Sequence, residues 1–224
     1  MCTGKCAKCI GGTLYPLAAI CLICNIILFF PGWSTVYVQG KDPENKSLIT
    51  EEVKYMGGLI GGGIMVLIPA IHIHATGKRG CCGNRCGMFL SIAFATLGVI
   101  GSLYSFVTAT LGLVNGPLCE YTENGQLVWG TPFKSANGEF SNESYLFKKE
   151  LWEKCEQPKD VVEFNVILFS LILAASGIEM VLCLIQMVNG LFGCLCGTCA
   201  EKGVRAPLVW SLNITRRHHK LCLI

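Results

Sequence analysis

The stretch FNVILFSLILAASGIEMVLCLIQMVNGLF, residues 164–192, decides the fold class of this chain. Its only formal charge is Glu179, and its apolar residues follow neither a helical nor a strand period. At about 1.5 Å per residue, a helix of this length more than covers a hydrocarbon core of about 30 Å. The stretch therefore predicts a transmembrane helix.

Three further blocks, 10–30, 56–76 and 88–114, are also apolar and poor in charge, and each is long enough, at about 20 residues or more, to cross a bilayer. A mean hydropathy of +0.51 with only 15% charged residues excludes an ordinary soluble domain. The first block also fits a secretory signal, but it is longer than a signal's apolar core and no A-x-A-like cleavage site follows it. We therefore expect an all-α membrane protein, a bundle of four transmembrane helices.

Basic residues are concentrated in alternate connecting segments. Segments 1–9, 77–87 and 193–224 hold 10 of the 18 Lys and Arg residues and one acid, whereas 31–55 and 115–163 hold 13 of the 15 acids. Basic segments next to membrane spans tend to stay in the cytoplasm. We therefore expect both termini to be cytoplasmic and the two acidic segments to be extracellular or lumenal.

Segment 115–163 is the one sizeable polar piece of the chain. The turn signal at 124–125 predicts a hairpin between two short strands. Helical periodicity over 145–155 predicts a short helix with Phe147 on its apolar face. We expect these two elements to form a small loop domain.

Two cysteines, Cys119 and Cys155, are the only ones in the segments expected outside the cytoplasm. We therefore predict that they form a disulfide, which would close the loop and stabilise its thin core. The same segments contain sequons at Asn45 and Asn142, and we expect both to be N-glycosylated.

Nine other cysteines lie at the expected cytoplasmic rim of the spans, where thiols stay reduced. S-palmitoylation is the favoured interpretation, because an acyl chain attached there enters the lipid directly. Unmodified thiols and a metal site are the alternatives, the latter because two pairs have C-x-x-C spacing. The nine candidates are Cys2, Cys6, Cys9, Cys81, Cys82, Cys86, Cys194, Cys196 and Cys199.

The second span begins with a glycine-rich run that includes Gly57, Gly58, Gly61 and Gly62. Glycines four residues apart leave one helix face without side chains, so another backbone can approach it closely. Packing within the bundle is the favoured interpretation. A dimer interface between two copies of the chain is the alternative.

Two polar residues inside the spans, Asn25 and Glu179, lie at similar depths from the cytoplasmic end, about 22 and 20 Å at 1.5 Å per residue. A lone carboxyl group in the membrane needs a partner or a proton, so we expect Glu179 to hydrogen-bond Asn25. A proton or ion site is the alternative role. No nucleophile and base accompany Glu179, so we predict no catalytic site, metal or cofactor.

Several motifs resemble, in their order and combination, those of the transmembrane-four L-six family of tetraspanin-like proteins. They are MCxGKCAKC (1–9), NIILFFP (25–31), the glycine-rich second span, CCGN (81–84), GPxC (116–119), NxxLFS (165–170) and GIExxLCxIQxxNG (177–190). True tetraspanins carry a Cys-Cys-Gly motif in the large outer loop, whereas residues 81–83 are expected on the cytoplasmic side. The tail after Cys199 departs from the family's short cysteine-rich ending.

The resemblance implies a plasma-membrane or endolysosomal glycoprotein that associates with integrins, tetraspanins and receptors and affects adhesion, migration, growth or signalling. We therefore expect a non-enzymatic organiser in the plasma membrane, with the lipid bilayer and membrane proteins as partners and no nucleic acid. A small-ligand sensor, channel or transporter that uses Glu179 is the alternative. It is disfavoured because further intramembrane charges and matching broken helices are missing from the sequence.

Overall fold

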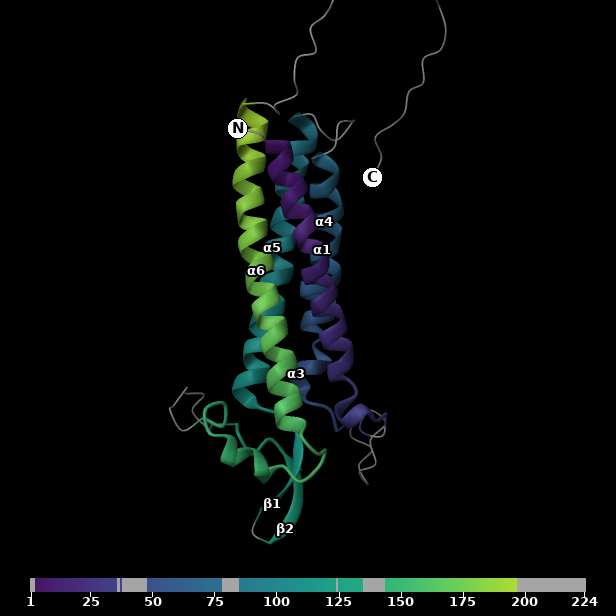
Figure 1. The fold of residues 1–224 in the computed structure, drawn as a ribbon, viewed down its shortest axis with the longest axis vertical. Helices are drawn as coiled ribbons and strands as arrows, with labels where there is room; N and C mark the ends of the chain where they lie inside the picture. Colours follow the sequence, from purple (N-terminus) through teal and green to yellow (C-terminus); the bar gives the residue numbers. More distant parts are fainter. Residues whose placement is uncertain are drawn as a thin grey trace, which may run out of the picture.

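Four long helical segments form an elongated bundle in the described part of this computed structural model (Figure 1). The structure describes residues 3–35, 37, 48–77, 85–123, 125–134 and 144–196. The main helices are α1 (Thr3–Leu28), the π-helix η2 (Gly57–Ile64) continued by α4 (Met65–Thr76), α5 (Arg85–Asn115) and α6 (Val161–Cys196).

Within the described residues, four segments are long and apolar enough to cross a membrane. This finding confirms the predicted fold class. The four segments are Gly4–Leu28, Glu51–Thr76, Cys86–Asn115 and Val161–Leu195. The start of α1 and the end of α6 lie at one end of the bundle, which we call the terminal end (Figure 1). The hairpin lies at the opposite end, which we call the loop end.

Side chains on the outside of the bundle are strongly apolar. Ile23, Ile71 and Ile100, from three different helices, are each more than half exposed. In water such a surface would oppose folding through the hydrophobic effect, whereas lipid chains solvate it without that cost. The bundle therefore has the exterior of a membrane protein.

The second span does not begin as the regular helix that the sequence predicts. A short helix, α3 (Glu51–Lys54), is followed by Met56 in the left-handed conformation, with φ of 51°, and then by η2. The first N–H groups of any helix lack partners within it. Here Leu59 N–H donates to Asn25 Oδ1 of α1 over 3.1 Å, so a side chain from another helix caps this irregular start.

The glycines of η2 are buried and lie against α1 and α5. A Cβ atom on Gly58 would be 2.9 Å from the carbonyl oxygen of Cys21, and one on Gly61 would be 2.5 Å from the carbonyl oxygen of Gly101. No alanine fits at such distances without movement of the neighbouring backbone. These glycines therefore serve packing within the chain.

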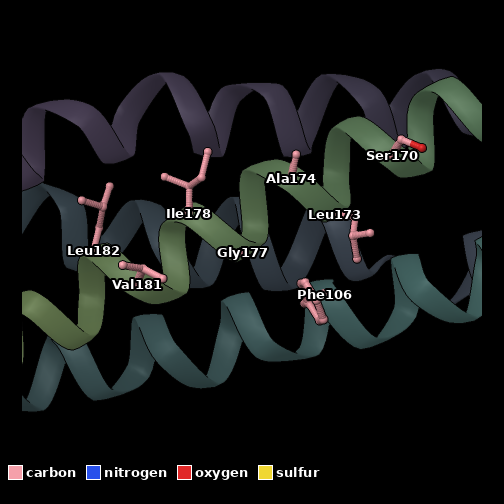
Figure 2. A pocket seen from close by; sticks show the side chains of 8 residues that line it. All are labelled: Phe106, Ser170, Leu173, Ala174, Gly177, Ile178, Val181 and Leu182. Carbon is pink, nitrogen blue, oxygen red and sulfur yellow. The ribbon is translucent and has the colours of Figure 1, made fainter.

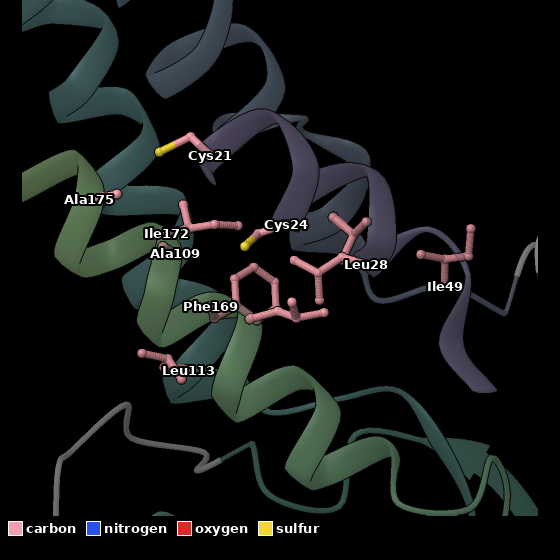
Figure 3. Packing of buried hydrophobic residues seen from close by; sticks show 11 residues of the cluster. Cys21, Cys24, Leu28, Ile49, Ala109, Leu113, Phe169, Ile172 and Ala175 are labelled. Carbon is pink, nitrogen blue, oxygen red and sulfur yellow. The ribbon is translucent and has the colours of Figure 1, made fainter. Parts of the chain in front are cut away.

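The core at the loop end is formed by α1, α5 and α6 (Figure 3). Phe169 of α6 lies in one cluster with Leu28 of α1 and Leu113 of α5, and Figure 3 shows its ring beside Cys24. Gly112 allows this position, because a Cβ atom there would be only 2.6 Å from the Phe169 ring. A second cluster, which includes Leu14, Val66 and Ile73, fills the other part of the bundle.

A small loop domain caps the loop end. Strands β1 (Cys119–Glu123) and β2 (Gln126–Gly130) pair antiparallel with Glu123 opposite Gln126, as the turn signal predicts. The expected helix over 145–155 is shorter and tighter, since only η4 (Lys149–Lys154), a 3₁₀-helix, forms. The placement of Phe147 on a buried face is wrong, because its side chain is 70% exposed. Two further short helices complete the described elements, α3 and the 3₁₀-turn η1 (Pro31–Trp33).

Candidate functional site

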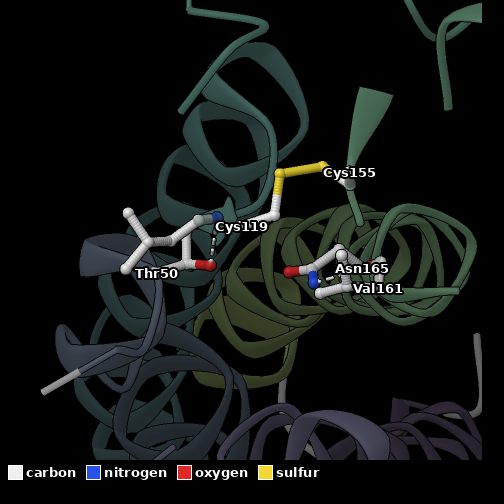
Figure 4. Close-up of a disulfide and its surroundings, with 6 residues drawn as sticks. Thr50, Cys119, Cys155, Val161 and Asn165 are labelled. Carbon is white, nitrogen blue, oxygen red and sulfur yellow. Dashed lines mark hydrogen bonds between the residues drawn. A yellow bond between two sulfur atoms is a disulfide. The ribbon is translucent and has the colours of Figure 1, made fainter. Parts of the chain in front are cut away.

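The loop domain is closed by the predicted disulfide between Cys119 and Cys155 (Figure 4). The two Cα atoms are 5.6 Å apart, and Cys119 is fully buried. The bond joins the first residue of β1 to the residue that follows η4. It therefore connects the hairpin covalently to the segment that leads back into α6.

Backbone hydrogen bonds extend this closure along β1. Glu120 N–H donates to the Gln157 carbonyl over 2.8 Å, and Glu156 N–H donates to the Glu120 carbonyl over 2.9 Å. Thr122 Oγ1 also donates to Glu156 Oε1 over 2.7 Å. Segment 156–157 thus pairs with one edge of β1, while β2 pairs with the other.

Tyr145 fastens the loop domain to the bundle. Its hydroxyl donates to the Leu113 carbonyl of α5 over 2.5 Å, and its ring stacks on Phe133 with 4.5 Å between centroids. Trp152 Nε1–H donates to the Tyr145 carbonyl over 2.8 Å. Burial raises the pKa of the Tyr145 hydroxyl, and the negative charge of Glu52 raises it further, so the phenol stays neutral.

The first loop supplies a second fastening. Leu118 N–H donates to Thr50 Oγ1 over 3.2 Å (Figure 4), and Asn115 Nδ2–H donates to Glu52 Oε1 over 2.6 Å. Thr50 is buried and precedes α3. The two loops and the end of α5 therefore form one connected structure at the loop end.

The interior of the bundle contains a fully buried carboxyl group, Glu179 of α6. The thiol of Cys21 on α1 lies 3.9 and 4.0 Å from its two oxygens and donates weakly to them. Asn25 is also buried, but its carbonyl oxygen accepts from Leu59 N–H. The described contacts therefore give Asn25 and Glu179 different partners in place of the expected direct hydrogen bond.

A second polar contact inside the bundle was missed by sequence reasoning. Gln186 is fully buried on α6, and its Nε2–H donates to Ser91 Oγ of α5 over 3.2 Å. Asn189 Nδ2–H donates to Gln186 Oε1 over 3.2 Å. Gln186 follows Glu179 by two helical turns, which places both on one face. That spacing was the signal available in the sequence.

The rim cysteines that can be located lie at the terminal end, on the helices themselves. Cys6, Cys9 and Cys86 are exposed, and Cys194 is half-buried. The side chains of Cys2, Cys81, Cys82, Cys196 and Cys199 lie outside the described residues, as do the sequons at Asn45 and Asn142. Within the described residues, no three His, Cys, Asp or Glu side chains converge as metal ligands.

A shallow groove runs along the outer surface between α5 and α6 (Figure 2). Phe106 of α5 lies against Gly177 of α6, where a Cβ atom would be 3.6 Å from the ring, an ordinary contact distance. Ser170 is the one polar residue among the side chains that line the groove. The groove lies within Cys86–Asn115 and Val161–Leu195, two of the segments that are long and apolar enough to cross a membrane.

Comparison with known proteins places this architecture in a family. The family model described as "L6 membrane protein" matches residues 1–200. The chain belongs to the L6 membrane protein family. Transmembrane 4 L6 family member 4 of Rattus norvegicus is 44% identical over 207 residues, which cover 89% of this chain and 94% of the relative.

Two human relatives agree with this placement. Transmembrane 4 L6 family member 5 of Homo sapiens is 43% identical over 207 residues, covering 90% of this chain and 98% of the relative. Member 1 of Homo sapiens is 41% identical over 209 residues, covering 90% and 96%. No solved structure matches the chain. Family and fold together identify a tetraspanin-like, multi-pass membrane protein.

Proposed function

We propose that the protein is a non-enzymatic organiser of the plasma membrane that associates laterally with integrins, tetraspanins or receptors. In this proposal the loop domain is extracellular and both termini are cytoplasmic, as the positions of the basic residues favour. These associations modulate adhesion, migration, growth or signalling. The partner classes come from the family resemblance, whereas the preformed loop domain is an observation on this chain.

The observation that carries the proposal is the fixed attachment of the loop domain. The Cys119–Cys155 disulfide closes it, Tyr145 ties it to Leu113 of α5, and Thr50 ties it to the first loop. A surface that is already ordered loses little conformational entropy when a partner binds. The loop domain is thus suited to recognise the outer parts of neighbouring membrane proteins.

Proximity labelling in intact cells tests this proposal. The peptide that recruits the labelling enzyme is best inserted at Gly125, because the space around that turn residue is open to 4 Å. We expect adhesion proteins or receptors to be enriched with the intact loop and lost with the Cys119→Ser variant. Equal enrichment by both proteins, or none by the intact one, would contradict the organiser proposal.

Acylation of the terminal-end cysteines forms part of the same proposal. Cys6, Cys9 and Cys86 expose their thiols beside the lipid-facing ends of α1 and α5. A thiol at that position can receive an acyl chain that enters the bilayer without crossing polar surface. Hydroxylamine treatment should reduce the mass of the cellular protein by the acyl groups. An unchanged mass would show that the thiols carry no acyl group and would contradict this part of the proposal.

A sensor, channel or transporter is the second candidate function. The observation that favours it is the burial of Glu179. Its carboxyl group contacts a thiol, a weak donor, although it lies in a membrane-spanning helix. If Glu179 transfers a proton or ion, Glu179→Gln should abolish pH-dependent flux in proteoliposomes. If Glu179 is structural, the unchanged protein and the variant should both show only background flux. The substitution should then change only the thermal stability.

A further inference from the structure

Among the large apolar residues of the loop domain that the structure describes, Phe147 has the most exposed side chain, at 70%. A single exposed apolar residue on a soluble protein needs no special account. In a membrane protein the height of the residue along the bundle decides whether water or lipid surrounds it. The contacts of the two residues that precede Phe147 give that height.

Tyr145 and Leu146 place Phe147 level with the last turns of α5. The hydroxyl of Tyr145 reaches the carbonyl of Leu113, and Leu146 packs on the core cluster that contains Leu113 and Phe169. Leu113 and Phe169 both lie inside the apolar segments long enough to cross the membrane. The backbone of the loop domain therefore returns to the edge of the bilayer at this point.

Trp33 gives an independent marker at the same height. It is 77% exposed, and its ring contacts Phe164 in the first turns of α6 with 6.5 Å between centroids. Exposed aromatic residues at the ends of membrane spans lie at the boundary between lipid and water. Phe147 and Trp33 come from different segments of the chain, and Leu146 and Phe164, which lie beside them, pack against the same core cluster at the loop end.

The residues after Phe147 suit the same boundary. Lys148 and Lys149 are exposed, and the Lys149 ammonium lies 5.3 Å from the centre of the Trp152 ring. Lysines beside a lipid-immersed residue extend their charged groups to the phosphates. We propose that Phe147 inserts into the upper acyl-chain region of the leaflet at the loop end, and so anchors the loop domain to the phospholipid bilayer.

This anchoring divides the loop domain into two surfaces. The face that carries Phe147 contacts phospholipid, while the hairpin, which lies farthest from the bundle in Figure 1, extends into water. Leu127 of β2 is 59% exposed. The inference goes beyond the proposed function, because it holds on whichever side of the membrane the loop lies.

Tryptophan fluorescence of the full chain in proteoliposomes tests the inference. Phe147→Trp and its matched control Leu127→Trp are each made in a Trp33→Phe background, which removes one native tryptophan at the boundary. The vesicles contain phosphatidylcholine with bromine atoms near the top of the acyl chains. We expect the tryptophan at 147 to emit at shorter wavelength and to lose at least half of its added emission to bromine. The tryptophan at 127 should lose almost none.

Equal emission wavelength and equal quenching for the two variants would overturn the proposal. Because both leaflets contain brominated lipid, the direction of insertion does not affect the result. A second measurement uses the unchanged protein with a phosphatidylcholine that carries a diazirine high on its acyl chain. Irradiation should attach the lipid to the peptide that contains Phe147 and not to the β2 peptide. Attachment to neither peptide would also overturn the proposal.

Discussion

The change Tyr145→Phe removes one hydroxyl group and leaves the ring stacked on Phe133. The lost hydrogen bond is the one to the Leu113 carbonyl in the last turn of α5. Carbonyls in a final turn have no partner within the helix, and a buried one left unpaired costs about 1–3 kcal/mol. We expect the attachment of the loop domain to weaken by about 1–2 kcal/mol, which raises its opening equilibrium by roughly 5- to 30-fold.

Hydrogen exchange of the loop domain measures this effect in the purified protein. The amide of Glu120, which donates to Gln157, should exchange faster by the same factor. Tyr121→Phe is the matched control, since the Tyr121 hydroxyl makes an exposed contact with Glu123. Surface changes of that kind stay within about 0.5 kcal/mol. If the two variants exchange alike, Tyr145 does not hold the loop domain on the bundle.

Two further substitutions test other parts of the structure, and a change of pH tests the Tyr145 attachment again. Cys119→Ser should cost the loop domain roughly 3–4 kcal/mol by the chain-entropy relation, seen as rapid exchange and proteolysis of the loop; a protected loop would contradict it. Gly61→Ala should lower thermal stability by about 1–3 kcal/mol, because a Cβ there would lie 2.5 Å from a carbonyl of α5. Gly12→Ala, where the nearest atom is 4.0 Å away, should be neutral or stabilising. Because the folded pKa of Tyr145 is raised, the attachment should be constant below about pH 10 and weaken as pH rises further toward the folded pKa; Tyr145→Phe should lack this loss.

The membrane spans and the disulfide were predictable because each depends on composition along the chain. Apolar blocks of sufficient length have few alternatives to crossing a bilayer, and Cys119 and Cys155 had no competing cysteine in their segments. The hairpin was predictable for a similar reason. Gly125 has φ of 80°, a conformation that glycine adopts without strain.

The partners inside the bundle were not predictable from depth alone. Counting residues placed Asn25 and Glu179 at similar heights, but residues four apart share a helix face, so the difference lies in the height along α1. In the structure Glu179 is level with Cys21, one helical turn nearer the terminal end than Asn25. Asn25 turns instead to the start of η2, where an irregular helix leaves Leu59 N–H without a partner. That irregular start has no periodic signal in the sequence.

The segment around Tyr145 was misread because tertiary contacts override its helical period. Placing Phe147 and Leu151 on one face would have required a regular α-helix through this segment. Instead, Tyr145 and Leu146 turn back toward α5, and the Trp152 side chain bonds the Tyr145 carbonyl. The chain then forms only the 3₁₀-turns of η4. Local propensity was too weak to compete with these contacts.

The hydrogen bond from Tyr145 to the Leu113 carbonyl at the end of α5 also affects how force passes from the loop domain to the bundle. A partner that pulls on the hairpin loads α5 directly through residues 116–118, and loads the segment that enters α6 through the disulfide. That load reaches the last turn of α5 and the first turns of α6, where Phe169 fits against Gly112. Tension applied outside the bilayer would therefore arrive as a shift between two neighbouring membrane helices, rather than dissipate in a flexible tether.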